Sequence, residues 1–169
     1  MNKIISKINL RQILFYIVGI ICIIFSFKNI ALLFDTELLE LIDKNGLEKT
    51  WSILADKGSV EDKIADFYIR DSIAAISGII IGLLFSLYIS VKKNGWWINS
   101  LIILISILII FRLISFDEVL LKPLSFFGNK IFSEKVFYRI LFNGIMYLII
   151  AIMIYFYPRI QSITYKDKK

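Results

Sequence analysis

The stretch AAISGIIIGLLFSLYIS, residues 74–90, is built mainly of Ile, Leu and Phe, yet a small residue returns at every fourth position. Those small residues are Ala74, Gly78, Gly82, Ser86 and Ser90. Together with its apolar flanks, this uncharged run matches the roughly 20 residues with which a helix crosses the hydrocarbon core of a bilayer. Helices in lipid associate through close backbone packing, which small residues four apart permit. The stretch therefore predicts a membrane-spanning helix with one narrow face for a neighbour.

The composition of the whole chain favours the same class of protein. Hydrophobic residues make up 58% of the 169 residues, above the roughly 45–50% of soluble domains. Charged residues lie mostly between long apolar runs. We predict a single domain over residues 1–169, an all-α membrane protein with four transmembrane helices in a bundle, at about residues 12–34, 71–91, 96–116 and 136–158.

The segment between the first two predicted spans, residues 35–70, is patterned rather than irregular. Apolar residues recur there at helical spacing, and the Asn-Gly pair at 45–46 is a typical helix stop. We expect short amphipathic helices that form a cap outside the bilayer. In one interpretation the cap only covers the bundle. In another it docks an extracytoplasmic partner through Trp51, Leu47 and Leu54, because aromatic residues often anchor such contacts.

Basic residues are densest near the two chain ends and between the second and third predicted spans. They are Lys3, Lys7, Arg11, Lys92, Lys93, Arg159, Lys166, Lys168 and Lys169. Because short cytoplasmic flanks carry an excess of Lys and Arg, we expect both termini in the cytoplasm and a multi-pass protein in the bacterial inner (plasma) membrane. Trp96, Trp97, Tyr155 and Tyr157 are then expected at the cytoplasmic interface, where aromatic side chains gather.

The first predicted span carries its own line of small or polar residues, spaced three or four apart on one helical face. The line consists of Gly19, Cys22, Ser26 and Asn29. We expect it to pack against the small residues of 74–90 inside the bundle. The alternative is that these faces serve self-association or receive a helix of another protein.

Charged residues near the predicted outer ends of the spans allow three interpretations. Lys28 and Arg112 are long enough to reach the headgroups independently from within a span. Alternatively, Asp71 at the start of the second span forms an ion pair with Arg112 at the end of the third. In the third interpretation these charges bind a substrate.

The sequence contains few groups suited to catalysis or metal binding. It has no histidine and a single cysteine, Cys22, so the commonest general base and metal ligand is missing. We therefore predict no catalytic, cofactor-binding or metal-binding residues. The chain is expected to be a non-enzymatic accessory or scaffold subunit of a membrane assembly. Its expected partners are the lipid bilayer and another membrane protein or a second copy, without nucleic acid.

Two other classes of function stay open. A small transporter or channel component would line a water-filled path with polar residues of the spans, namely Ser77, Ser86, Asn99, Ser106 and Asn143. A membrane-embedded enzyme acting on lipids would use acidic residues at the outer face, such as Asp71 or Glu118.

Overall fold

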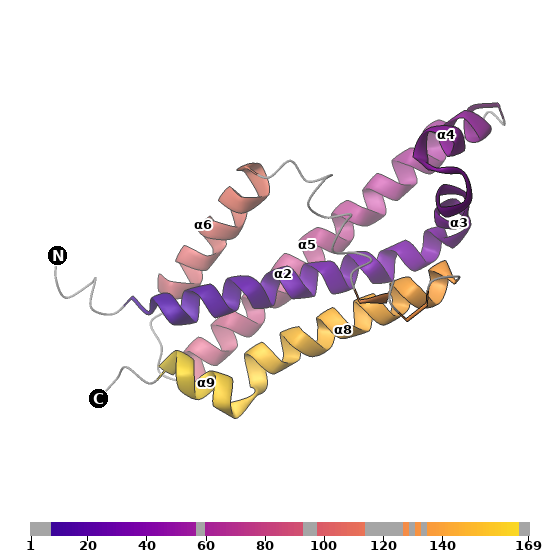
Figure 1. The fold of residues 1–169 in the computed structure, drawn as a ribbon. Helices are drawn as coiled ribbons and strands as arrows, with labels where there is room; N and C mark the ends of the chain where they lie inside the picture. The colour runs from indigo at the N-terminus through magenta and orange to yellow at the C-terminus, as the bar shows by residue number, and fades with distance from the viewer. Residues whose placement is uncertain are drawn as a thin grey trace.

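The computed structural model describes residues 8–56, 60–92, 98–113, 127–128, 131–132 and 135–165, and these contain helices and short turns but no strand. Figure 1 shows their arrangement. The helices are α2 (Leu10–Leu32), the 3-10 turn η1 (Leu33–Asp35), α3 (Thr36–Asn45), α4 (Leu47–Asp56), α5 (Val60–Lys92), α6 (Ile98–Leu113), α8 (Val136–Phe156) and α9 (Pro158–Tyr165).

Three helical stretches are long and apolar enough to cross a membrane: Leu10–Asn45, Ala65–Lys92 and Val136–Phe156. This confirms an all-helical chain with membrane-length helices at three of the four predicted spans. The apolar part of α6, Ile98–Ile110, is shorter. The predicted span 96–116 begins and ends outside the described residues, so a fourth crossing stays a prediction.

Helix α2 lies at the centre of the described structure. Helices α5 and α8 pack along it from two sides, α6 contacts it as well, and α5 and α8 contact each other much less. The side chains of Tyr16, Ile20, Ile23 and Ile24 are accordingly almost fully buried. The outer faces of α5 and α8, in contrast, expose many Ile and Leu side chains. An apolar surface around an apolar centre is the arrangement expected of helices that face lipid.

The ends of the helices follow from local sequence. Asn9 caps α2, because its side-chain oxygen accepts a hydrogen bond from the backbone N–H of Gln12 at 3.0 Å. Gly46, with a φ of 76°, ends α3 in a conformation that favours glycine. Tyr157 is extended before Pro158, and the proline begins α9 because it lacks the N–H that would continue α8.

The two ends of the molecule differ in architecture. At one end, the α9 end, α9 packs against α2 and α8. At the other, the cap end, α4 folds back on α3 and contacts α5, while α3 contacts α8 (Figure 1). Helix α5 has 33 residues, so it is about 50 Å long and exceeds the roughly 30 Å of hydrocarbon. Its first turns therefore belong to the cap end.

Candidate functional site: polar contacts around the central helix

The small residues of α5 lie against α2. Ala74, Gly78, Gly82, Ser86 and Ser90 are all buried. A Cβ atom added to Gly78 would lie 2.8 Å from the Cα of Ile24, and one added to Gly82 would lie 2.6 Å from Cγ1 of Ile20. These distances are too short for real atoms, so the backbones of α5 and α2 approach as closely as glycine allows.

The expectation that the small residues of α2 meet those of α5 is wrong. Gly19 faces the ring of Tyr155 in α8, since an added Cβ would lie 2.8 Å from Cε2. A Cβ added to Gly144 of α8 would lie 3.1 Å from Cβ of Asn29 and 3.4 Å from the carbonyl oxygen of Ser26, a close but less tight approach. The physical reason is complementarity, because the space left by a small residue is best filled by a large one. Gly78 and Gly82 of α5 thus receive Ile24 and Ile20 of α2, and Gly19 of α2 receives Tyr155 of α8.

Tyr155 joins three helices through its hydroxyl group. The hydroxyl lies 3.2 Å from Oγ of Ser86, 3.2 Å from the carbonyl oxygen of Tyr16 and 3.3 Å from that of Gly82. Ser86 donates its own hydrogen bond to the Gly82 carbonyl at 2.8 Å. Tyr155 is only 1% exposed, so its side chain lies inside the helix packing, and its predicted level at a membrane interface stays a prediction. The face of α8 that carries Tyr155 turns toward α2 and α5, where its O–H finds carbonyl oxygens as acceptors. We call Tyr155, Ser86, Tyr16 and Gly82 the Tyr155 cluster.

A second group, the Gln12 cluster, joins α2, α5 and α6 near the α9 end. It consists of Asn9, Gln12, Ser90 and Asn99. The Gln12 amide donates from Nε2 to Ser90 Oγ at 2.9 Å, and it accepts at Oε1 from Asn99 Nδ2 at 3.3 Å. The backbone N–H of Asn9 donates to Asn99 Oδ1 at 3.3 Å. These bonds satisfy buried amides that would otherwise cost free energy.

A third group, the Asn143 cluster, joins α2 and α8 in their halves nearer the cap end. Asn143 donates from Nδ2 to Asn29 Oδ1 at 3.3 Å, and Asn29 donates to the carbonyl of Phe25 at 2.7 Å. The side-chain oxygen of Asn143 is also bonded, because Oδ1 accepts a hydrogen bond from the backbone N–H of Phe127 at 2.9 Å. Both asparagine side chains are fully buried. The cluster thus fixes the turn at 127–128 to the two helices.

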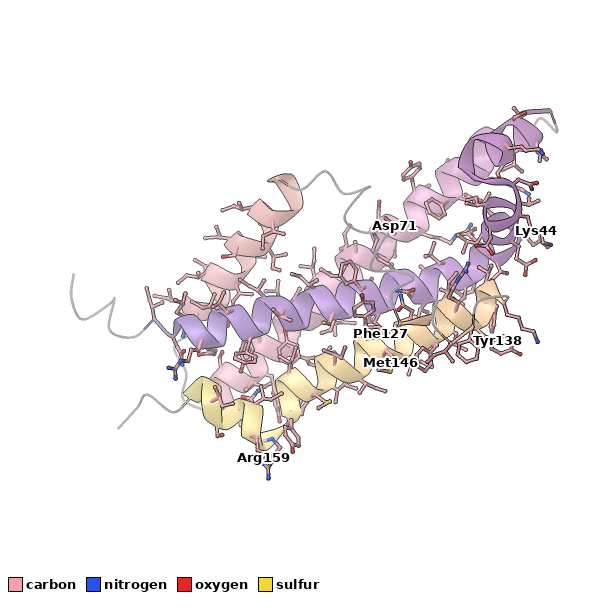
Figure 2. All side chains as sticks on the ribbon, in the orientation of Figure 1. Lys44, Asp71, Phe127, Tyr138, Met146 and Arg159 are labelled. Carbon is pink, nitrogen blue, oxygen red and sulfur yellow. The ribbon has the colours of Figure 1, made fainter. Side chains whose placement is uncertain are left out.

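An ion pair joins α2 to α5 close to this third cluster. Lys28 Nζ lies 2.7 Å from Asp71 Oδ2, and the side chains are 3% and 26% exposed. The interpretation of Lys28 as a residue that reaches out to headgroups is therefore wrong, because a carboxylate on the facing helix holds it inside. The predicted partner of Asp71 was Arg112, whose side chain lies outside the described ones. In the structure Asp71 has a different cationic partner (Figure 2 labels Asp71 on α5).

Two further ion pairs hold the cap end. Arg70 of α5 pairs with Asp35 of η1, and Arg139 of α8 pairs with Asp43 of α3 at 2.8 Å. Both are more exposed than the pair of Lys28. They connect α5 with η1, and α3 with α8. Exposed pairs of this kind orient helices more than they stabilise them.

Of the three predicted docking residues of the cap, the structure describes the side chain of Leu54. Leu54 is buried, only 2% exposed, because α4 turns that face toward α3 and α5. The side chains of Trp51 and Leu47 lie outside the described ones. Leu54 therefore belongs to the interior of the cap.

The polar residues predicted to line one water-filled path lie apart from one another. Ser86 belongs to the Tyr155 cluster, Asn99 to the Gln12 cluster and Asn143 to the Asn143 cluster. Ser77 and Ser106 are half-buried. Glu118, named for a lipid-acting enzyme, lies outside the described residues. Ser86, Asn99 and Asn143 thus belong to three separate clusters that connect helices.

Sequence reasoning missed Gln12 and Tyr16 as members of this polar set. A signal was present, because the polar and small residues of α2 continue at spacings of three and four along one stripe. The stripe consists of Gln12, Tyr16, Gly19, Cys22, Ser26 and Asn29. Extending the line by about two helical turns toward the N-terminus predicts both residues.

Within the described ranges, no group of three His, Cys, Asp or Glu side chains is placed to hold a metal ion. Cys22 is buried and free. Comparison of the chain with models of protein families, with curated proteins and with solved structures returned no match.

Proposed function

We propose that the chain is a non-enzymatic accessory or scaffold subunit of a membrane assembly. The observation that carries this proposal is that buried polar side chains bond to groups on neighbouring helices. The Gln12, Tyr155 and Asn143 clusters and the Lys28–Asp71 pair each connect α2 to a neighbouring helix. Polar groups that bind one another in this way stabilise the arrangement of helices and are not presented to a substrate.

The placement in a bilayer is supported by exposed tyrosines. On α5, Tyr68 and Tyr88 are both exposed, and 20 residues of helix separate them by about 30 Å. On the α8 side, Tyr138 and Tyr157 are exposed and lie about 28 Å apart by the same rise. Tyrosines favour the two interfaces of a bilayer, whose hydrocarbon core is about 30 Å thick. The exposed Ile and Leu residues between these levels would face lipid.

In this placement four helices, α2, α5, α6 and α8, form a transmembrane bundle of the bacterial inner membrane. Both chain ends lie on its cytoplasmic side, and α3 and α4 form a cap on the opposite side. The basic residues near the chain ends support this orientation. The outer apolar faces of α5, α6 and α8 would be shared between lipid and a partner membrane protein or a second copy.

The proposal is tested by purification from native membranes in a mild detergent, with the protein mass measured by light scattering. We expect a complex heavier than the 19.7 kDa chain, with a fixed ratio of a second polypeptide or of a second copy. Leu84→Trp, Leu108→Trp and Ile149→Trp each enlarge an exposed residue on a different helix. One of the three should release the partner while all three keep the native unfolding midpoint. A lone monomer that is stable and fully extracted would contradict the proposal.

A small transporter or channel component is the second candidate, and the Lys28–Asp71 pair favours it. Ionisable side chains inside membrane helices often belong to ion or substrate pathways. The test introduces cysteine at Ser86, Asn99 or Asn143 in a Cys22→Ser background and applies a water-soluble thiol reagent to intact membranes. Labelling at all three positions would support a continuous aqueous path. Absence of labelling, with Ser162→Cys labelled as an exposed control, would remove this candidate.

A further inference from the structure

The acidic side chains that the structure describes lie away from the α9 end, whereas described cationic side chains lie at both ends. The described charged side chains at the α9 end are Arg11, Lys92 and Arg159, and all three are exposed. The Gln12–Ser90 hydrogen bond brings the start of α2 to the end of α5, and α9 packs on α2. All the acidic side chains that the structure describes belong to residues 35–71. Figure 2 shows Arg159 and Lys44 at opposite ends.

Helix α9 is fixed at this end by a buried glutamine. Gln161 donates from Nε2 to the carbonyls of Ile154 and Tyr155, at 2.9 and 2.8 Å. These carbonyls belong to the last turn of α8, which the break at Pro158 leaves without helical partners. The helix therefore has a defined position across the end of α8, and it is not a free tail. Its outer surface presents Arg159 and Ile163, one cationic and one apolar side chain.

The α9 end lies at the level of one proposed membrane interface. Tyr88 is four residues before Lys92 on α5, and the Lys92 ammonium lies 5.7 Å from the centre of its ring. Tyr157 directly precedes α9 and is exposed. Tyrosine rings mark the headgroup region, so the three cations occupy the depth at which phosphate groups of lipids are found. Exposed cationic side chains at this depth attract anionic headgroups.

We propose that the α9 end binds anionic phospholipid headgroups of one leaflet through Arg11, Lys92 and Arg159. The inference rests on the proposed insertion in a bilayer, but it does not depend on an accessory role. Its chemistry is the pairing of lysine and arginine with lipid phosphate, helped by the apolar contact of Ile163 with the acyl boundary. Binding at this end holds the protein at one depth and in one orientation.

The test titrates the full-length protein in an uncharged detergent with phosphatidylglycerol or with phosphatidylcholine and follows the thermal unfolding midpoint. We expect phosphatidylglycerol to raise the midpoint and phosphatidylcholine to leave it nearly unchanged. Arg159→Gln should weaken the apparent affinity for phosphatidylglycerol about 5-fold, and the triple variant with Arg11→Gln and Lys92→Gln about 100-fold. The rise should also diminish as NaCl is added.

The matched control removes the same charge from the opposite end, with Lys44→Gln, Lys49→Gln and Lys63→Gln, all exposed residues. This variant should keep the response of the wild-type protein. Equal responses to the two lipids, or a full response in Arg159→Gln and the triple variant, would overturn the proposal. A similar rise with inorganic phosphate would also overturn it, in favour of a small-anion site. Each of these results is obtained independently of whether a protein partner co-purifies, so failure here is distinct from failure of the proposed function.

Discussion

Neutralising Asp71 should destabilise the protein more than neutralising any exposed acidic residue. In Asp71→Asn the Lys28 ammonium stays in place, 3% exposed, without the carboxylate at 2.7 Å. Removing one partner of a buried ion pair costs about 3–5 kcal/mol, because the other charge stays desolvated and loses its attraction to that partner. Since Asp71 is 26% exposed, water or headgroups near it compensate part of this loss, and we expect about 3 kcal/mol.

The reverse substitution should cost less. Lys28→Met removes the more buried charge and leaves a carboxylate that water reaches, so we expect about 1 kcal/mol. In the double variant, Lys28→Met with Asp71→Asn, neither charge of the pair remains, and its stability should lie within about 1 kcal/mol of the wild type. Because the single losses of about 3 and about 1 kcal/mol are almost absent from the double variant, the cycle predicts a coupling free energy of about 4 kcal/mol.

The assay is reversible unfolding of the purified protein with increasing SDS in mixed micelles, followed by circular dichroism. The control is Asp43→Asn, which breaks the more exposed pair with Arg139 at 2.8 Å and should cost less than about 1 kcal/mol. Equal losses in Asp71→Asn and Asp43→Asn, or a double variant that shows the sum of the two single losses, would refute the buried pair.

Three other substitutions test the contacts around α2 in the same assay. Gly78→Ala should lower the free energy of unfolding by about 1–3 kcal/mol, because its new methyl group meets the Ile24 backbone. The control Ile80→Ala, on the exposed side of α5, should change it by less than about 1 kcal/mol. Equal losses in the two variants would contradict the packing. Tyr155→Phe should lose about 1 kcal/mol with the hydroxyl contacts to Ser86, Tyr16 and Gly82, while Tyr157→Phe serves as the exposed control and should be neutral. Gln12→Leu should lose about 1–3 kcal/mol by leaving Ser90 and Asn99 without its amide, and a neutral or stabilising result would refute the Gln12 cluster.

The positions of the long helices could be predicted because they depend on the length of apolar runs. Predicted spans 12–34 and 136–158 agree closely with α2 (Leu10–Leu32) and α8 (Val136–Phe156). Span length follows from the rise per residue and the thickness of the bilayer. The exact ends of the helices depend on local sequence, and the Asn-Gly pair at 45–46 correctly predicted the end of α3.

The partners of individual side chains could not be predicted, because they depend on how each helix is rotated about its axis. Tyr155 and Tyr157 are two residues apart, so they point to different sides of α8 and one is buried while the other is exposed. Lys28 is likewise turned toward α5 by the packing of α2, where it finds Asp71. A one-dimensional pattern of small residues predicted a close-packed face on α5 but not which residues fill it.

The central claim is that α2 lies inside the membrane, surrounded by α5, α6 and α8. The most direct test is labelling of the protein in native membranes with a lipid-soluble diazirine, followed by mass spectrometry at residue resolution. We expect strong labelling of the exposed residues Ile80 and Leu84 on α5 and Ile149 on α8, and almost none at Ile20 and Ile24 of α2. Labelling of Ile20 and Ile24 as strong as that of Ile80 would contradict the central position of α2. Labelling of Ile80, Leu84 and Ile149 by a water-soluble diazirine and not by the lipid-soluble one would contradict the insertion of these helices in a membrane.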